Sequence, residues 1–261
     1  MSRGTKPLLS GRLKARAQKE LLLQKQEDAQ RTYPFEQISP RLKVKISPRA
    51  KRMALRLDPK TRHINLVVPK RSSIQSAFLF AEENADWIEE KLAELPQPIK
   101  FTDGTTLPLL GRPRMIVVEY NPKAKTTNIT LNRHEILVST NKKDPSSRIK
   151  RYLVDLAKTS LSTMAHEKAE QIGKTISSLE VKDTISRWGS CSCDGKISLS
   201  WRLIFAPKEA YDYVVAHEVA HLVHLDHSQH FWDVCEDLSW KYEYGHRWIK
   251  ENGNELMRYT D

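Results

Sequence analysis

The sequence has few cysteines and few glycines, and each shortage excludes a class of protein. Only three cysteines occur among the 261 residues: Cys191, Cys193 and Cys235. A disulfide framework needs several paired cysteines, so we expect no disulfide scaffold and a reducing, cytoplasmic location. The nine glycines form no glycine-rich loop of the kind that cradles nucleotide phosphates.

Long apolar runs are also missing. The longest ones, such as residues 77–81, are far too short to cross a bilayer, so we expect no membrane association. Residues 1–23 carry basic side chains throughout and no sustained apolar segment, so we expect no secretory signal peptide. With 39% hydrophobic and 29% charged residues, the composition is that of a globular protein with one or two domains.

Positive charge is concentrated at the N-terminal end. The first 60 residues contain sixteen Lys or Arg and five Asp or Glu, whereas the other 201 residues contain 27 of each kind. A basic arm of this kind can bind nucleic acid or an anionic lipid surface. The alternative is a solvated extension, which the lack of aromatic interleaving or an RNA-binding signature favours.

Changes in charge and hydrophobic pattern divide the sequence into three regions. Residues 1–39 form a basic extension, disordered or helical, with a candidate helix over residues 13–30. Residues 40–144 form a β-rich accessory region with one helix, and residues 145–261 carry the residues with recognisable chemistry.

Alternating apolar residues predict strands, and apolar residues three or four apart predict helices. In the accessory region we expect strands over residues 42–46, 53–57, 64–68, 115–120, 128–131 and 135–138, and a helix over residues 73–94. In the last region we expect strands over residues 178–185 and 196–205, helices over about residues 146–172 and 207–225, and a helix after Ser228. Gly173 is a typical helix stop and Pro207 a typical first-turn residue.

The last region contains a motif typical of zinc sites. His217, Glu218 and His221 form an H-E-x-x-H sequence within an expected helix. Residues four apart lie one turn apart on the same helix face, so both imidazoles can reach one ion. Glu218 projects from the adjacent position, where it can act on a metal-bound water rather than bind the metal.

A catalytic zinc site needs a third protein ligand. His227 follows His221 by six residues and precedes Ser228, a good N-cap for the next helix. The turn expected between the two helices can bring His227 back toward the first two histidines, and we favour it as the third ligand. His224 and His230 remain alternatives, although His224 would crowd the ion from one side and His230 lies within the next helix.

The surplus histidines near the motif, including His246, are open to two interpretations. One of them could donate a hydrogen bond to an oxyanion, or each could be an ordinary surface residue, which we favour. Cys191 and Cys193 form a C-x-C pair, but a cysteine-based zinc site usually needs a second pair and only Cys235 remains. We therefore expect buried or reduced thiols.

Four segments together resemble the YgjP-like metallopeptidase family, which is related to the SprT-like and WLM-type zinc proteases. They are residues 187–191 (RWGSC), 197–203 (ISLSWRL), 213–221 (YVVAHEVAH), and His227-Ser228 with Phe231-Trp232. The resemblance covers about residues 41–255 and does not include residues 1–39.

The resemblance implies an α+β fold in which a zincin-like catalytic domain with an active-site H-E-x-x-H helix follows a β-rich N-terminal part. It also implies zinc held by His217, His221 and His227, with Glu218 catalytic. Asp226 is a departure, because the family often has Asn before the third histidine, but it removes no ligand. The metzincin pattern has the same histidine spacing, with a glycine where this chain has His224.

Three functions follow as hypotheses. The first is a zinc metallopeptidase that cleaves proteins or peptides. The second is a metal-dependent nucleoside triphosphate pyrophosphatase, because similar chains have been assigned to UTP hydrolysis; the lack of a phosphate-binding loop weighs against it. The third is a nucleic-acid-associated binding protein with a vestigial site, against which the intact Glu218 argues. The sequence predicts no particular oligomeric state.

The strand expected over residues 196–205 is open to two interpretations. It precedes the motif helix, where an edge strand could pair with an extended substrate. Alternatively it is simply a member of the sheet. Arg187 and Trp188 could line the cleft, and Trp188 is equally compatible with a core position.

Overall fold

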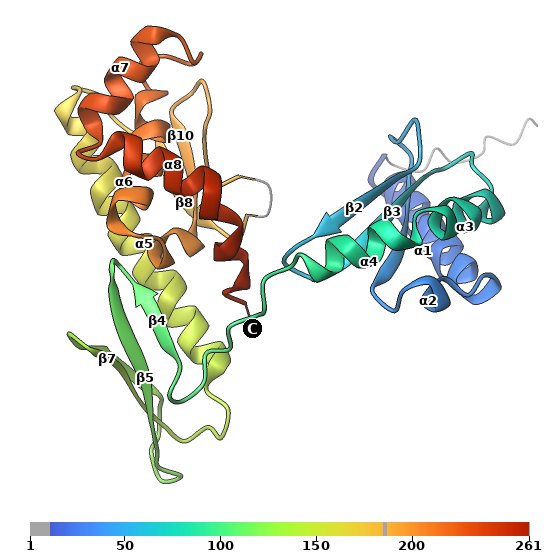
Figure 1. The fold of residues 1–261 in the computed structure, drawn as a ribbon, viewed down its shortest axis with the longest axis horizontal. Helices are drawn as coiled ribbons and strands as arrows, with labels where there is room; N and C mark the ends of the chain where they lie inside the picture. Colours follow the sequence, from blue (N-terminus) through green and yellow to red (C-terminus); the bar gives the residue numbers. More distant parts are fainter. Residues whose placement is uncertain (1–10, 185–186, 261) are drawn as a thin grey trace, which may run out of the picture. The chain divides into compact units, whose positions relative to one another are not determined.

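A computed structural model describes residues 11–184 and 187–260 of the chain (Figure 1). Helices alternate with three small separate sheets, which is the α+β class that the sequence predicts. The chain divides into two compact units, Met1–Leu95 and Pro96–Asp261. Residues 1–10 of the basic extension and Ile185, the last residue of an expected strand, lie outside the described residues.

The first unit is a three-stranded sheet with helices. Its elements are α1 (Gly11–Thr32), α2 (Phe35–Ile38), β1 (Leu42–Ser47), β2 (Ala54–Asp58), β3 (His63–Pro69), α3 (Ile74–Glu83) and α4 (Ala85–Ala93). The strand order is β1-β3-β2, with β1 parallel and β2 antiparallel to β3. The helix expected over residues 13–30 is confirmed by α1, and the three expected strands by β1, β2 and β3.

The alternation of each strand separates a buried face from an outward face. Leu42 and Val44 of β1 and Leu66 of β3 are buried, and they share a core with Ala77 of α3 and Ile88 of α4. The sequence pattern predicts one helix over residues 73–94, and this prediction is wrong in one respect. The helix breaks at Asn84, whose side-chain amide donates to the carbonyl oxygen of Phe80, 2.7 Å away.

The second unit contains two sheets around a long helix. Its strands are β4 (Thr106–Leu109), β5 (Arg112–Tyr120), β6 (Asn128–Leu131), β7 (Glu135–Thr140), β8 (Ser178–Lys182), β9 (Gly189–Cys191) and β10 (Lys196–Ser200). Its helices are α5 (Ser146–Gln171), η1 (Trp201–Phe205), α6 (Lys208–Ala220), α7 (Gln229–Leu238), α8 (Tyr242–Asn252) and η2 (Gly253–Arg258). The sheet orders are β4-β5-β7-β6 and β8-β10-β9.

One hydrophobic core joins the β4–β7 sheet to the helices that follow it. Leu107 and Ile116 from that sheet belong to the same buried cluster as Leu153 of α5 and Val215 of α6. The chain passes from one compact unit to the other between Leu95 and Pro96, whereas the sequence patterns divide it after residues 39 and 144. The strands of residues 106–140 were grouped with the preceding sheet because hydrophobic alternation does not tell which core a strand faces.

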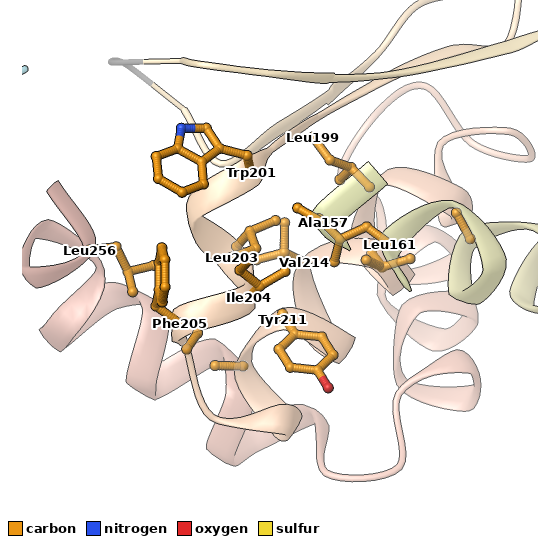
Figure 2. Close-up of a cluster of buried hydrophobic side chains, with 14 of the residues drawn as sticks. Ala157, Leu161, Leu199, Trp201, Leu203, Ile204, Phe205, Tyr211, Val214 and Leu256 are labelled. Carbon is orange, nitrogen blue, oxygen red and sulfur yellow. The ribbon is translucent and has the colours of Figure 1, made fainter. Parts of the chain in front are cut away.

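The segment before α6 forms the centre of this core. Trp201, Leu203 and Phe205 of η1 are almost completely buried, and Figure 2 shows their side chains near Val214 of α6 and Leu256 of η2. The strand expected over residues 196–205 ends at Ser200, because the next five residues form this short 3-10 helix. A continuous buried run carries no period that separates strand from helix.

The end of helix α5 and the apolar character of the helices can also be compared with what the sequence predicts. Helix α5 ends as predicted: Gly173 has φ 64°, and the amide of Lys174 donates to the carbonyl oxygen of Ala169 at 2.9 Å. Among the described residues, no helix combines the length and the apolar character that a membrane span needs.

Candidate metal centre

Helix α6 contains His217 and Glu218, has His221 as its C-cap, and is buried on almost every side. It packs against α5, α7, α8 and β9, and of its thirteen residues only Lys208, Glu209 and His217 are not buried. The contact with α8 is close at Gly245, where an added Cβ would lie 2.6 Å from the Cβ of Tyr213. Helix α6 is thus a rigid base from which His217 reaches the surface.

The chain leaves the helix at His221 and returns at His227. The helix was expected to run to about Leu225, but it ends at Ala220, and His221 is its C-cap. Three backbone hydrogen bonds, from the amides of residues 222, 223 and 224, then close a tight turn. The side chain of Asp226 accepts from the amide of Ser228 at 3.1 Å, a contact that the more usual Asn could also make.

The structure brings His217, His221 and His227 together. One ring nitrogen from each lies within 4.8 Å of the other two, and the Nε2 atoms of His217 and His227 are 3.3 Å apart. Two ligands held about 2.0–2.1 Å from an ion at a tetrahedral angle are separated by roughly 3.3–3.4 Å. The donor set and this spacing both fit a zinc ion. His227 is exposed, so the cluster opens to solvent.

The hydrogen bonds and the protonation of the cluster also suit a cation. Nδ1 of His221 lies 2.9 Å from the carbonyl oxygen of His224. Because a carbonyl only accepts, Nδ1 carries the proton and Nε2 keeps its lone pair for a ligand bond. Burial, with a smaller effect of the neighbouring histidines, lowers the pKa of His217 to about 4. His217 is therefore neutral at pH 7, as a metal ligand must be.

Two aromatic side chains at the start of α7 hold the imidazoles. The ring of Phe231, which is completely buried, lies 4.5–4.9 Å from each of the three histidine rings. The Trp232 ring lies 5.7 Å from His217 and 5.5 Å from His227. In the sequence, Phe231 and Trp232 were noted only as part of the family resemblance. The position of Phe231 four residues after His227 was the available signal for this role.

The surplus histidines lie outside the cluster. The rings of His224 and His230 face one another with centroids 6.1 Å apart. The ring of His246 lies 5.2 Å from Tyr213, which in turn lies 5.9 Å from His217. None of the three belongs to the metal-binding group that the described residues form.

Glu218 is buried against strand β9. Only 6% of the residue is exposed, and an added Cβ at Gly189 would lie 2.4 Å from its Oε1 atom. Gly189 thus leaves the space that the carboxyl group fills. Burial raises the pKa of Glu218 to about 8, against the opposing effect of the positive charge of Arg187. Glu218 was predicted from its motif, whereas Gly189 was not, since a single glycine in a sequence does not reveal which side chain fills its space.

Strand β9, rather than β10, is an edge of its sheet. Strand β10 pairs with β8 on one side and β9 on the other, so residues 196–200 are not an edge strand, and the strand is simply a member of the sheet. The amide of Ser200 donates to the carbonyl of Trp188, and that of Ser192 to the carbonyl of Lys196. In an antiparallel pair the alternate residues, Gly189 and Cys191, direct their backbone groups to the other edge.

The cysteines contribute no ligand to the cluster. Burial raises the pKa of Cys191 to about 11 and that of Cys235 to about 12, so both are thiols at neutral pH. No disulfide joins the three cysteines, and Cys193 is exposed.

The model of a protein family described as the YgjP-like, metallopeptidase domain matches residues 51–252 of the chain. The matched region includes the three clustered histidines and Glu218. Comparisons with curated proteins and with solved structures find no match.

Proposed function

Because the chain belongs to the YgjP-like metallopeptidase family, we propose that it is a zinc-dependent peptidase of zincin-like architecture. In this proposal His217, His221 and His227 hold the ion and Glu218 is the general base. When bound, zinc supplies Lewis acidity and lowers the pKa of water to about 7.

The observation that carries the proposal is the approach of the histidine rings. The Nε2 atoms of His217 and His227 face one another at 3.3 Å. Two neutral nitrogen lone pairs at this distance repel unless a proton or a cation lies between them. Three protein ligands also leave a fourth tetrahedral position open, which distinguishes a catalytic site from a closed structural one.

Glu218 has the properties of a proton carrier. Its carboxyl group is buried and its pKa is raised to about 8, and a general base is most effective when its pKa lies near the working pH. In peptide hydrolysis it takes a proton from the attacking water and delivers it to the nitrogen of the leaving amine. The contact with Gly189 fixes the carboxyl group for both transfers.

The edge strand β9 favours an extended peptide as the substrate. The outward backbone groups of Gly189 and Cys191 can pair with a peptide as an added strand. Because Gly189 also contacts Glu218, a peptide paired there lies alongside the proton carrier. We expect main-chain pairing to give affinity for unfolded segments of proteins rather than for folded surfaces.

Hydrolysis by paired variants tests this proposal. Zinc-loaded wild type, Glu218→Gln and Glu236→Gln are compared on unfolded, fluorescein-labelled casein and on UTP. Glu236 is an exposed carboxylate on α7 and is the matched control. We expect casein cleavage by wild type and Glu236→Gln, and a loss of at least ~100-fold in Glu218→Gln at unchanged zinc content.

Two results would contradict the proposal that the protein is a peptidase. UTP turnover that collapses in Glu218→Gln, with casein left intact, would assign the site to nucleotide hydrolysis. Full zinc content without turnover of either substrate would make the metal structural.

A further inference from the structure

Charge is separated within the first unit. Residues 41–73, which form the sheet and its loops, contain eleven Lys or Arg and one Asp or Glu. Residues 74–95, which form α3 and α4, contain one Lys and six Asp or Glu. The sheet is therefore strongly positive, whereas α3 and α4, two of the helices that pack on it, are negative.

The strands arrange part of this positive charge on the face opposite the core. Lys43 and Lys45 alternate with buried residues on β1 and are exposed. Both Lys43 and Arg56 pair in register with Asn65 of the central strand, so they lie in one row across the sheet. Strand geometry separates Lys43 from Lys45 by roughly 7 Å and from Arg56 by roughly 10 Å.

Two loops extend the positive charge at one end of the sheet. Because β1 and β3 are parallel, with Ser47 opposite Pro69, the chain leaves both strands at the same end of the sheet. The exposed residues there are Arg49, Lys51, Arg52, Lys70 and Arg71. A groove of about 810 Å³ lies among these loops and Gln18 of α1. We call Lys43, Lys45, Arg56 and these five loop residues the basic face.

Acidic and apolar side chains are nearly missing from this surface. The one carboxylate, Asp58, accepts hydrogen bonds from the amides of Lys60 and Thr61 in its own turn. Among the described residues of this unit, the large exposed apolar side chains are Leu21, Leu23 and Leu79, on α1 and α3. Residues 41–73 also contain no Phe, Trp or Tyr.

We propose that the basic face binds the phosphate backbone of a nucleic-acid duplex without reading its sequence. The six residues of β1 span roughly 20 Å, and a duplex presents one negative charge per ~1.7 Å of its axis. Proteins that bind single strands use aromatic side chains to stack bases, and this face has none. It also lacks the apolar side chains with which surface helices enter a lipid bilayer.

This proposal does not depend on the metal centre. The family match begins at residue 51, so Lys43, Lys45 and Arg49 lie outside it. The other five residues of the basic face lie within the matched region.

Fluorescence anisotropy with a labelled 20-base-pair duplex of mixed sequence tests the proposal on the full chain. DNA and RNA duplexes are titrated at salt concentrations from 50 to 200 mM. The variant Lys43→Gln/Lys45→Gln/Arg56→Gln removes three outward cations. The control Lys123→Gln/Lys125→Gln/Lys143→Gln makes the same change of net charge with exposed lysines of the second unit. Melting curves verify that both variants fold.

We expect the wild type to bind with a dissociation constant near the micromolar range. The strand variant should bind at least tenfold more weakly at 100 mM salt, and its log–log salt slope should be smaller by about 2–3. The control should change affinity less than twofold. No duplex binding by the wild type at 50 mM salt, or an equal loss in both variants, would overturn the proposal. Tighter binding to phosphatidylserine vesicles or to polyglutamate would assign the face to a lipid surface or an acidic protein instead.

Discussion

Replacing Gly189 with alanine should displace the carboxyl group of Glu218 while leaving the three histidines in place. The new Cβ would lie 2.4 Å from Oε1, 2.5 Å from Cγ and 2.7 Å from Cδ of Glu218. The φ angle of Gly189 is not in the positive range that disfavours alanine, so the backbone accepts the new side chain. The whole effect therefore acts through Glu218.

The distances set the size of the effect. Ordinary contacts begin at 3.4 Å, so either the carboxyl group or β9 must move by about 1 Å. Crowding of this kind in a packed interior costs about 1–3 kcal/mol of folding stability. A 1 Å displacement of a reacting group can lower the rate about 100-fold, which equals about 2.7 kcal/mol in the activation free energy.

The assay is kcat for peptide hydrolysis, measured together with zinc content and melting temperature. Ser190→Ala, on the same strand, is the control because it removes a hydroxyl group and adds no atom. We expect Gly189→Ala to keep one zinc per chain and to lose about 100-fold in kcat, whereas the control keeps its rate. Unchanged kcat in a folded, zinc-loaded Gly189→Ala would refute the reasoning, because it would show that the carboxyl group does not depend on this space.

Three other predictions concern the metal ligands, Glu218 and a buried ion pair. His227→Ala should lower zinc affinity more than 100-fold and His224→Ala less than tenfold, as measured by competition with a fluorescent chelator. The pKa of Glu218 lies above its unfolded value, so metal-free protein should lose stability as the pH rises through 8. The free energy of unfolding of Glu218→Gln should therefore exceed that of the wild type by roughly 2–4 kcal/mol at pH 9 in EDTA. Equal midpoints in urea unfolding would contradict this. Lys168 pairs with Asp212 at 2.7 Å, and both side chains are buried. Lys168→Met leaves the carboxylate buried without its partner, so it should lower the free energy of unfolding, measured in urea, by about 3–5 kcal/mol, and Lys168→Met/Asp212→Leu should lower it much less.

The histidine cluster could be anticipated from the sequence because its parts follow local rules. His217 and His221 are four residues apart on a helix, and Ser228 indicates where the next helix starts. The path between them follows no such rule. The helix ends at Ala220 because three backbone bonds close a turn there, and no apolar period or turn residue in the sequence marks that end.

Other parts of the site depend on contacts between distant segments. Gly189 matters because Glu218, 29 residues later, fills the space where a side chain would be. Residues 201–205 are all buried, Arg202 included, so their burial carries no period, and a strand was expected where a 3-10 helix lies. Helix α8 was not predicted, yet Gly245 allows its close contact with α6. Sequence patterns describe one element at a time, and these features arise between elements.

The central claim is that three histidines hold one zinc ion and leave a position open. X-ray absorption at the zinc edge of the loaded protein tests this most directly. We expect three imidazole nitrogens and one further oxygen at roughly 2.0–2.1 Å, with the same spectrum in Glu218→Gln. A sulfur ligand near 2.3 Å, or fewer than three imidazoles, would contradict it.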